Sequence, residues 1–378
     1  MAARQLIEPD MNFIHKLGDF GGDTLKKCFQ CATCSVVCKL SPDKNPFPRK
    51  EMIWAGWGLK DKLVTDPDIW LCHQCNDCST YCPRGAKPGD VLGAIRTYSF
   101  MHYAFPSFLG KALSDGKFLP LLLAIPVVLL LFLMGVSGHL NIPEGEIVFE
   151  KFVPHYIVDP LFIMVSILIA ISLLIGVTRF WNGMKNGVHP SGTKNVSVGD
   201  FVKLHVIPTL VDIFKHSKFM ECDTNRFRYI AHLLIFYSFI ALAIVTGVVF
   251  LGIYFLGIEH MLPLSQWNPV KLLANAGAIA LFVGCTMVIS NRLKQEEDKS
   301  RTTYFDWAFI IIVYLVAISG ILTELTRLAH LAVLAYPFYF IHLVLVFYLL
   351  AYLPFSKFAH MIYRTVALVY SSYSGREG

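Results

Sequence analysis

Six long apolar runs dominate the chain after residue 117, and they predict six transmembrane helices. The runs cover approximately residues 118–138, 160–178, 229–256, 272–290, 307–323 and 334–356. Each is close to the ~20 residues that a helix needs to cross the hydrocarbon core. Pro120 and Pro126 interrupt the first run, but prolines are tolerated in spanning helices whose neighbours satisfy the freed carbonyls.

The first 117 residues have a different pattern, in which polar and apolar positions are mixed. They carry 15 Lys and Arg and 12 Asp and Glu, whereas only 16% of the whole chain is charged. Ordinary soluble proteins have about 25% charged residues. The sequence therefore predicts a water-facing domain at 1–117 and a membrane domain at 118–378.

Basic residues also predict how the bundle is oriented. The loops 179–228, 291–304 and 357–378 carry 8, 4 and 3 Lys or Arg, whereas each loop on the opposite side carries one. Basic loops face the cytoplasm, and the chain opens without the apolar segment of a secretory signal. We expect a multi-pass protein of the inner membrane with both termini in the cytoplasm. The net charge of +6 lies mostly in these loops, which excludes a nucleic-acid-binding interpretation.

The long loop 181–228 contains a mixed stretch at 201–219. This stretch is typical of an amphipathic helix lying at the membrane interface. A docking surface for a partner protein is the alternative, and the sequence leaves both open.

Eight of the ten cysteines form two quartets with the spacing Cys-x2-Cys-x2-Cys-x3-Cys. This is the run that binds 4Fe–4S clusters in bacterial ferredoxins, where the fourth cysteine serves the other cluster. We therefore assign Cys28, Cys31, Cys34 and Cys82 to one cluster, and Cys72, Cys75, Cys78 and Cys38 to the other. The first quartet departs from the usual pattern because Lys39 follows Cys38 where proline is common.

A structural zinc site is the alternative for these cysteines. Zinc sites use two Cys-x2-Cys pairs, so a third cysteine at the same short spacing, present twice, favours clusters. In a cytoplasmic domain, ligation is also favoured over disulfides. The two remaining cysteines, Cys222 and Cys285, are isolated and are interpreted as non-ligands.

Three histidines lie in or beside the predicted helices, where ionisable side chains are rare and indicate function. His232 lies one turn into the third helix, and His360 lies at the cytoplasmic end of the sixth. His342 precedes His360 by about five helical turns, so both would project from one face, about 27 Å apart. We expect His232 and His360 to be the axial ligands of a haem b near the cytoplasmic face.

His342 would serve a second haem near the outer face. No histidine lies at its level on the third helix, near Phe250, so its partner is either His139 or His155. Because no Cys-x-x-Cys-His motif occurs, any haem is non-covalent. Nucleotide-binding loops and protease motifs are also missing, so the chain alone holds no complete substrate-converting site, and the residues of a quinone site stay unassigned.

These motifs resemble known families. Residues 1–100 resemble the C subunit of heterodisulfide reductase, in which two quartets flank a helical insert. Residues of about 155–365 resemble the cytochrome b subunit of respiratory nitrate reductase and the membrane subunit of heterodisulfide reductase. That group has a haem histidine where His232 stands and two histidines 18 apart, as His342 and His360 are. Its further histidine, ten residues after the first, is Leu242 here.

The fusion of both parts resembles the C subunit of the quinone-interacting membrane-bound oxidoreductase family of sulfate-reducing microbes. The resemblance implies two flavin and iron–sulfur partner proteins similar to the A subunit of heterodisulfide reductase. It also implies that electrons move between menaquinone and adenylylsulfate reductase.

The sequence thus predicts a mainly α protein with an α-helical, ferredoxin-like two-cluster domain and a six-helix transmembrane bundle. Its expected function is electron transfer between menaquinone and cytoplasmic flavoproteins through one or two haems b and two 4Fe–4S clusters. The membrane arm of a heterodisulfide-reductase-type complex is the first alternative. A zinc-containing membrane scaffold or sensor is the second.

Overall fold

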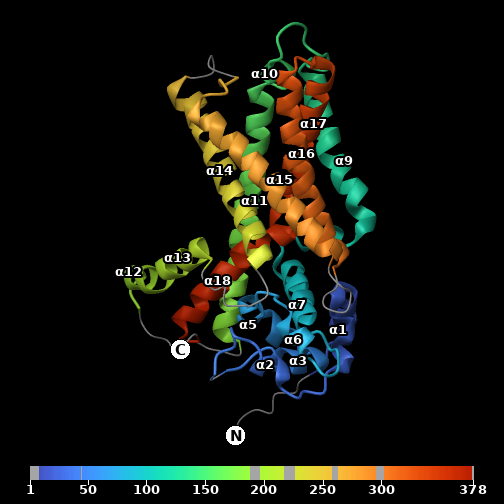
Figure 1. Ribbon diagram of the computed structural model, residues 1–378, viewed down its shortest axis with the longest axis vertical. Helices are drawn as coiled ribbons and strands as arrows, with labels where there is room; N and C mark the ends of the chain where they lie inside the picture. The colour runs from blue at the N-terminus through green and yellow to red at the C-terminus, as the bar shows by residue number, and fades with distance from the viewer. Residues whose placement is uncertain are drawn as a thin grey trace.

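A computed structural model describes residues 8–43, 45–187, 196–216, 226–257, 263–294 and 302–376. Helices make up all the regular secondary structure of these residues, as the sequence predicts. Figure 1 shows a bundle of long helices standing on a group of short helices formed by the N-terminal residues.

In the N-terminal region, short helices surround one longer helix, α7 (Pro88–Tyr103). Asp10 caps the first helix by accepting a hydrogen bond from the backbone N–H of Phe13. Pro88 begins α7 at a position where its missing N–H would have no partner within the helix. The short helices are α1 (Met11–Leu17), α2 (Thr33–Val36), α3 (Arg49–Gly56), α4 (Lys60–Val64), α5 (Asp68–Leu71), α6 (Asp77–Thr80) and α8 (Ser107–Ser114).

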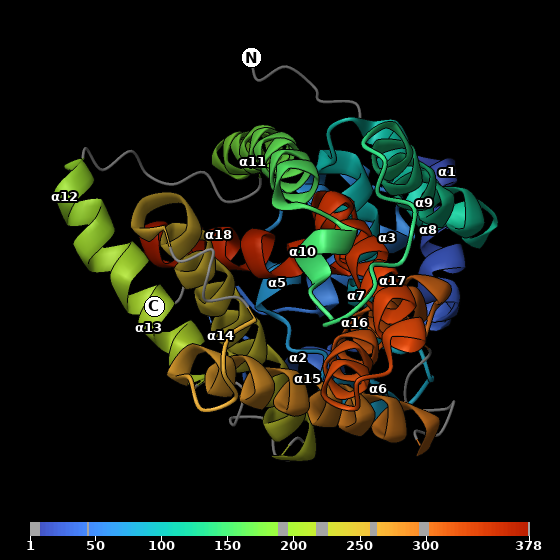
Figure 2. The same ribbon diagram turned by 90° about the horizontal axis from the view of Figure 1, so that it is seen from above.

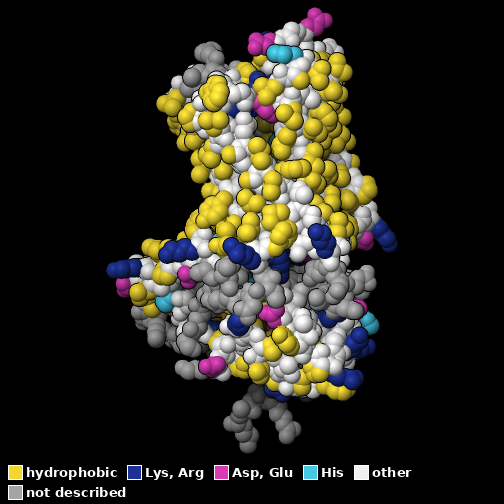
Figure 3. Space-filling model, in the orientation of Figure 1, with side chains coloured by type: hydrophobic (Ala, Val, Ile, Leu, Met, Phe, Trp, Pro, Cys, Tyr) yellow, Lys and Arg dark blue, Asp and Glu magenta, His cyan; other side chains and the backbone are white. Residues whose placement is uncertain are grey.

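The bundle contains six helices that are long and apolar enough to cross a membrane, which confirms the predicted number within the described residues. The chain is therefore a multi-pass membrane protein. Figure 3 shows an apolar flank on the bundle, with Lys and Arg side chains gathered where the bundle meets the N-terminal region. The spanning helices are α9 (Leu119–Val136), α11 (His155–Asn186), α14 (Arg226–Leu256), α15 (Pro269–Lys294), α16 (Tyr304–Leu328) and α17 (Ala332–Ala351), and the short α10 (Phe149–Phe152) precedes α11.

The chain breaks after the sixth spanning helix, which contradicts the prediction of one continuous helix up to His360. Helix α17 ends at Ala351, two short 3₁₀ turns follow, and a separate helix, α18 (His360–Tyr373), begins at the histidine. Pro354 cannot donate the N–H that a continuing helix needs, and the Ser356 hydroxyl caps the second turn. The argument that His342 and His360 project from one helix face is therefore wrong.

Residues 198–215 form a helical segment beside the bundle. It consists of α12 (Val198–Phe201), a π-helical turn and α13 (Ile207–Lys215). Its apolar side chains include Leu204, which is 58% exposed, and Ile207, which is 51% exposed. Figure 1 shows the segment projecting sideways where the bundle meets the N-terminal region, so an interfacial helix and a docking surface both stay predictions.

The N-terminal region and the bundle share one hydrophobic core. Trp70 is 1% exposed and belongs to this core. Its ring stacks on Tyr363 of α18 at 5.7 Å and meets Phe180 of α11 edge-on at 5.9 Å. Aromatic side chains contribute a large share of the energy of a buried core. These contacts therefore hold the N-terminal region and the bundle together. Figure 2, which looks down on the molecule, also shows α5 and α18 side by side.

Buried charges hold the turn after α18 against the N-terminal region. Arg376 Nε donates to Asp68 Oδ1 at 2.7 Å, and its guanidinium also pairs with Asp68 Oδ2. Lys50 Nζ lies 2.6 Å from Asp68, 3.0 Å from Asp66 and 3.2 Å from Glu51. Two cations thus pair with three buried carboxyl groups, and this pairing offsets the cost of removing the charges from water.

Candidate redox cofactor sites

The two cysteine motifs form loops with the same backbone conformation. The residues two and four positions after the first cysteine have positive φ angles in both: Gln30 at 60° and Ala32 at 70°, then Gln74 at 53° and Asn76 at 69°. Side chains rarely adopt this left-handed conformation, so its repetition marks a shared structural requirement. Each loop then enters a one-turn helix, α2 or α6, which carries the third cysteine of its motif.

The last cysteine of the second motif lies beside the first motif. Burial raises the pKa of the Cys34 thiol to about 11, and three neighbouring thiols contribute to the rise. These neighbours are Cys28, Cys31 and Cys82. The backbone N–H of Ala86 also donates to Cys82 Sγ at 3.3 Å.

The last cysteine of the first motif lies beside the second motif in the same way. Burial raises the pKa of the Cys38 thiol to about 12, with smaller contributions from Cys72 and Cys75. Burial also raises the pKa of Cys78, and Cys38 is one of the thiols that add to it. The side chains that the sequence grouped into two sets of four are therefore neighbours across the two motifs.

The two isolated cysteines are in different situations. Cys285 is buried within α15. Cys222 lies outside the described residues.

A cavity of about 320 Å³ separates the second cysteine loop from the membrane helices. His232 of α14, His360 of α18 and Cys72 of the loop all line it. The structure therefore brings together the two histidines that the sequence predicted as a pair, although separate helices supply them. Burial lowers the pKa of His360 to about 4, so its imidazole is neutral at pH 7 and has a lone pair.

Both histidines are oriented by a partner at Nδ1. His360 Nδ1 lies 2.6 Å from the carbonyl oxygen of Lys357, so this nitrogen carries the proton. His216 Nδ1 lies 3.3 Å from the carbonyl oxygen of Phe214, which leaves His216 Nε2 as an acceptor. His232 Nδ1 lies 2.9 Å from His216 Nε2 and must donate to it. In both His232 and His360 the unprotonated nitrogen is Nε2, as in metal-binding histidines that donate from the other nitrogen.

Sequence reasoning missed His216. It follows α13 in a long polar loop, where neither spacing nor membrane depth marks it. Its positive φ of 52° ends α13. Only the tertiary fold brings its ring to 5.0 Å from the ring of His232.

Two arginines connect the cavity histidines to the second cysteine loop. Arg228, one turn before His232, donates to the carbonyl oxygen of Gln74 at 2.7 Å. Arg364, one turn after His360, donates to the carbonyl oxygen of Cys72 at 3.3 Å. Each candidate haem ligand is thus on a helix that also holds the loop. Basic side chains from the described residues line the cavity at five positions: Arg96, Arg228, Arg292, Lys357 and Arg364.

The histidines assigned to a second haem have other partners. His342 Nδ1 lies 3.0 Å from the Ser319 hydroxyl, and its ring packs so closely on α16 that a Cβ at Gly320 would lie 2.9 Å from it. His139 Nδ1 lies 3.4 Å from the hydroxyl of Tyr156. His155 lies near Asp159, with 3.5 Å between Nδ1 and Oδ2. These contacts do not join His342 to either predicted partner, so the ligand pair of a second haem stays a prediction.

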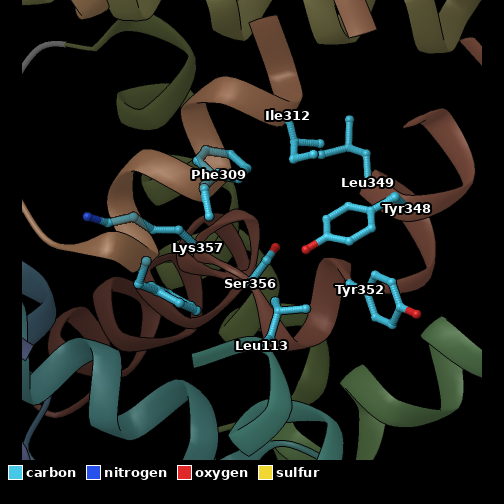
Figure 4. Close-up of a pocket in the computed structure, with 10 residues that line it drawn as sticks. Leu113, Phe309, Ile312, Tyr348, Leu349, Tyr352, Ser356 and Lys357 are labelled. Atoms are coloured by element: carbon cyan, nitrogen blue, oxygen red, sulfur yellow. The ribbon is translucent and has the colours of Figure 1, made fainter. Parts of the chain in front are cut away.

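A smaller cavity lies beside the break between α17 and α18. Its volume is about 20 Å³, which is room for about one water molecule. Figure 4 shows the hydroxyls of Tyr348 and Ser356 pointing toward each other among apolar side chains. This is a packing gap rather than a cofactor site.

Comparison with known proteins finds family matches for two regions of the chain. Residues 24–86 match the 4Fe–4S dicluster domain. Residues 109–377, well over half of the chain, match the family model described as citrate utilization protein B. The chain belongs to the citrate utilization protein B family. No solved structure matches this family member.

Curated relatives of this citrate utilization protein B family member fall into two groups. Citrate utilization protein B of Escherichia coli is 27% identical over 321 residues, which are 82% of each chain. The C subunit of the H(2):CoB–CoM heterodisulfide,ferredoxin reductase of Methanothermobacter marburgensis is 40% identical over 88 residues, 23% of this chain and 47% of that protein. The chain thus spans about half the length of this relative. The E subunit of the dihydromethanophenazine:CoB–CoM heterodisulfide reductase of Methanosarcina thermophila is 29% identical over 172 residues, 42% of this chain and 64% of that protein.

Proposed function

We propose that the chain is the membrane electron-transfer component of a heterodisulfide-reductase-type complex. It would link a lipid-soluble quinone such as menaquinone to flavin and iron–sulfur partner proteins. The observation that carries this proposal is the cavity shared by His232, His360 and Cys72. One-electron transfer is the chemistry that 4Fe–4S clusters and a haem b supply when bound.

The proposed cluster ligands are the two crossed sets of cysteines. Cys28, Cys31, Cys34 and Cys82 form the first set, and Cys72, Cys75, Cys78 and Cys38 form the second. The matching loop conformations and the match of residues 24–86 to the dicluster domain support this assignment. So do the amide donors to Cys72 and Cys82, since hydrogen bonds to sulfur tune such sites.

The number of cysteines argues against the zinc alternative. Zinc sites use two Cys-x2-Cys pairs, whereas each motif here carries a third cysteine at the same short spacing. The fourth cysteine of each motif lies beside the other motif. This arrangement suits two clusters with several irons each.

His232 and His360 are the proposed axial ligands of one haem b. Their Nδ1 atoms are occupied, their Nε2 atoms have lone pairs, and the cavity between them is also lined by Phe236, Phe239 and Phe358. The basic side chain of Arg292 suits the carboxylates of such a group, whereas Lys357 is paired with Asp306. A second haem on His342, with His139 or His155, stays a prediction.

The two cysteine loops differ in their surroundings. The second loop lies on the cavity, where Arg228 and Arg364 hold it. The first loop lies away from the cavity and contains Cys31, which is exposed, next to Phe29, which is 68% exposed. We therefore propose that the second cluster exchanges electrons with the membrane part and the first with partner proteins.

The identity of the partners is proposed from relatives. The C and E components of heterodisulfide reductase are separate proteins in the relatives, and this chain resembles both. This supports partners resembling the A subunit of heterodisulfide reductase, on a cytoplasmic face marked by the basic loops. Adenylylsulfate reductase as a downstream partner stays a prediction, because the relative with matching length is named for citrate utilization. A dihydromethanophenazine-type donor is the alternative that the Methanosarcina thermophila relative favours.

The test is a spectrum of the purified protein, oxidised and reduced, with a pyridine haemochrome assay and an iron count. We expect one or two haems b per chain and about eight non-haem irons, since each 4Fe–4S cluster holds four. One haem would support the His232 and His360 site alone, and two haems would add the His342 site. A colourless protein that contains zinc would overturn the proposal.

A further inference from the structure

A groove opens on the lipid-facing flank at the end of the bundle remote from the N-terminal region. It lies between the start of α11 and the end of α14, and its volume is about 670 Å³. Its lining side chains from the described residues are apolar apart from Tyr254, which is 50% exposed. The lining residues are Pro160, Ile163, Met164, Ile167, Leu168, Phe250, Tyr254 and Phe255.

Behind the groove, a row of polar groups leads toward the surface. The Tyr254 hydroxyl donates to Asp159 Oδ2 at 2.7 Å. That oxygen lies 3.5 Å from His155 Nδ1, and His155 Nε2 lies 4.0 Å from Glu150 Oε2. The side chain of Asp159 is 19% exposed and that of Glu150 is 42% exposed. The row therefore leads from a largely buried carboxylate beside the groove to an exposed one at the surface.

This combination is unusual for a surface that lipid covers. His155 and Asp159 stand in the first two turns of α11, directly before the apolar run of residues 160–178. Ionisable side chains this close to the hydrocarbon face a partner or a functional site. Here an apolar wall bears a single hydroxyl, and that hydroxyl is backed by a carboxylate and an imidazole. Binding sites for small apolar molecules have this composition, in which a few polar groups fix the orientation of the ligand.

We propose that this groove binds the ring of an isoprenoid quinone, with Tyr254 as the hydrogen-bond partner of a ring oxygen. This inference rests on the quinone-linked function proposed above. Oxidation of the quinol yields the quinone, two electrons and two protons. The electrons would pass one at a time to the haem predicted at His342, the candidate haem ligand nearer this side of the bundle. The protons would leave from Tyr254 through Asp159 and His155 toward Glu150. In the reverse direction the same groups deliver the protons.

The groove suits a quinone better than the cavity beside the second cysteine loop. That cavity is lined by several basic side chains and by residues of the N-terminal region. The groove instead faces the hydrocarbon, so an isoprenoid tail stays in lipid while the ring meets Tyr254.

The experiment measures how fast menadiol, a soluble naphthoquinol, reduces the purified cofactor-loaded protein, with absorbance as the readout. We expect Tyr254→Phe and Asp159→Asn to slow this reduction at least tenfold while haem content and reduction by dithionite stay unchanged. Tyr314→Phe is the matched control, because it also removes one hydroxyl from a spanning helix, α16, and should behave like the native chain. Ile167→Trp fills the groove from a side chain that is 54% exposed and should raise the menadiol concentration needed for half-maximal rate.

The outcomes separate the two proposals. If menadiol fails to reduce the native protein although dithionite succeeds, the quinone-linked function itself is wrong. If menadiol reduces the native protein and all three groove variants at the same rate, the function stands and the groove assignment is overturned.

Discussion

His216 Nε2 lies 2.9 Å from His232 Nδ1, and this contact fixes the proton positions of both rings. Because His216 donates from its other nitrogen to the Phe214 carbonyl, it can only accept from His232. The ring of His232 is thereby held with Nε2 unprotonated. A residue from a loop thus orients a membrane histidine in the way that outer partners orient metal ligands.

Substitution of His216 should therefore weaken haem binding without abolishing it. His216→Leu removes the acceptor for His232 Nδ1, and loss of such a partner typically costs about 10–100-fold in affinity. The measurement is haem content under increasing detergent dilution, together with the reduction potential of the retained haem. An unchanged potential and affinity would show that the contact has no orienting role. His205→Leu, which removes a histidine bonded to Ser372 away from the cavity, is the control.

Removal of a proposed axial ligand should have a larger effect. His232→Ala and His360→Ala should each eliminate the haem absorbance, while iron and labile sulfide stay at the native level. Full haem content in both variants would refute the assignment. Haem content should stay high in His342→Ala if the cavity holds the sole haem, and should fall by half if a second haem is present.

The cluster assignment predicts a selective loss of iron. Cys75→Ala removes one ligand of the second set and should reduce non-haem iron from about eight to about four atoms per chain. Electron paramagnetic resonance of the reduced variant should then show one cluster without magnetic coupling to another. Cys285→Ala, at a buried cysteine of α15, should keep about eight irons, four for each cluster. Retention of all iron by Cys75→Ala would contradict the assignment.

The buried pair of Arg376 and Asp68 should stabilise the junction between the N-terminal region and the bundle. Their side chains are 2% and 0% exposed, and breaking one partner of such a pair typically costs about 3–5 kcal/mol. Arg376→Met should therefore lower the unfolding temperature clearly. Arg327→Met is the control at a more exposed ion pair of the remote end, where the effect should be smaller. Equal shifts in the two variants would argue against a special role of the junction.

The same charge cluster predicts how stability depends on pH. Burial, and next the Asp68 carboxylate, raise the pKa of Asp66 to about 6, whereas in an unfolded chain it is about 3.9. A carboxyl group with a raised pKa in the folded state contributes stability at low pH, and this contribution is lost as the pH rises through about 6. Asp66→Asn should therefore flatten the decline in unfolding temperature between about pH 4 and about pH 7. An identical decline in the variant would refute the link to Asp66.

Local patterns in the sequence predicted the helices and the cluster loops, because apolar runs and cysteine spacing are short-range signals. They also paired His232 with His360, although the reasoning assumed a continuous helix that Pro354 interrupts. The contact between His216 and His232, the aromatic core around Trp70 and the pair of Arg376 with Asp68 join distant segments. Local sequence patterns do not predict contacts between segments so far apart in the chain, so only the three-dimensional structure shows them.

Helix α18 and the turn after it have a consequence for how the protein is made. They supply His360, Arg364 and Arg376, yet Arg364 is made 292 residues after Cys72. The second cysteine loop therefore lacks its contacts with α18 and the neighbouring cavity until these residues have been made. Cofactor loading is thus expected to be completed only after α18 has been made, and a chain cut short within α18 should be degraded rather than assembled.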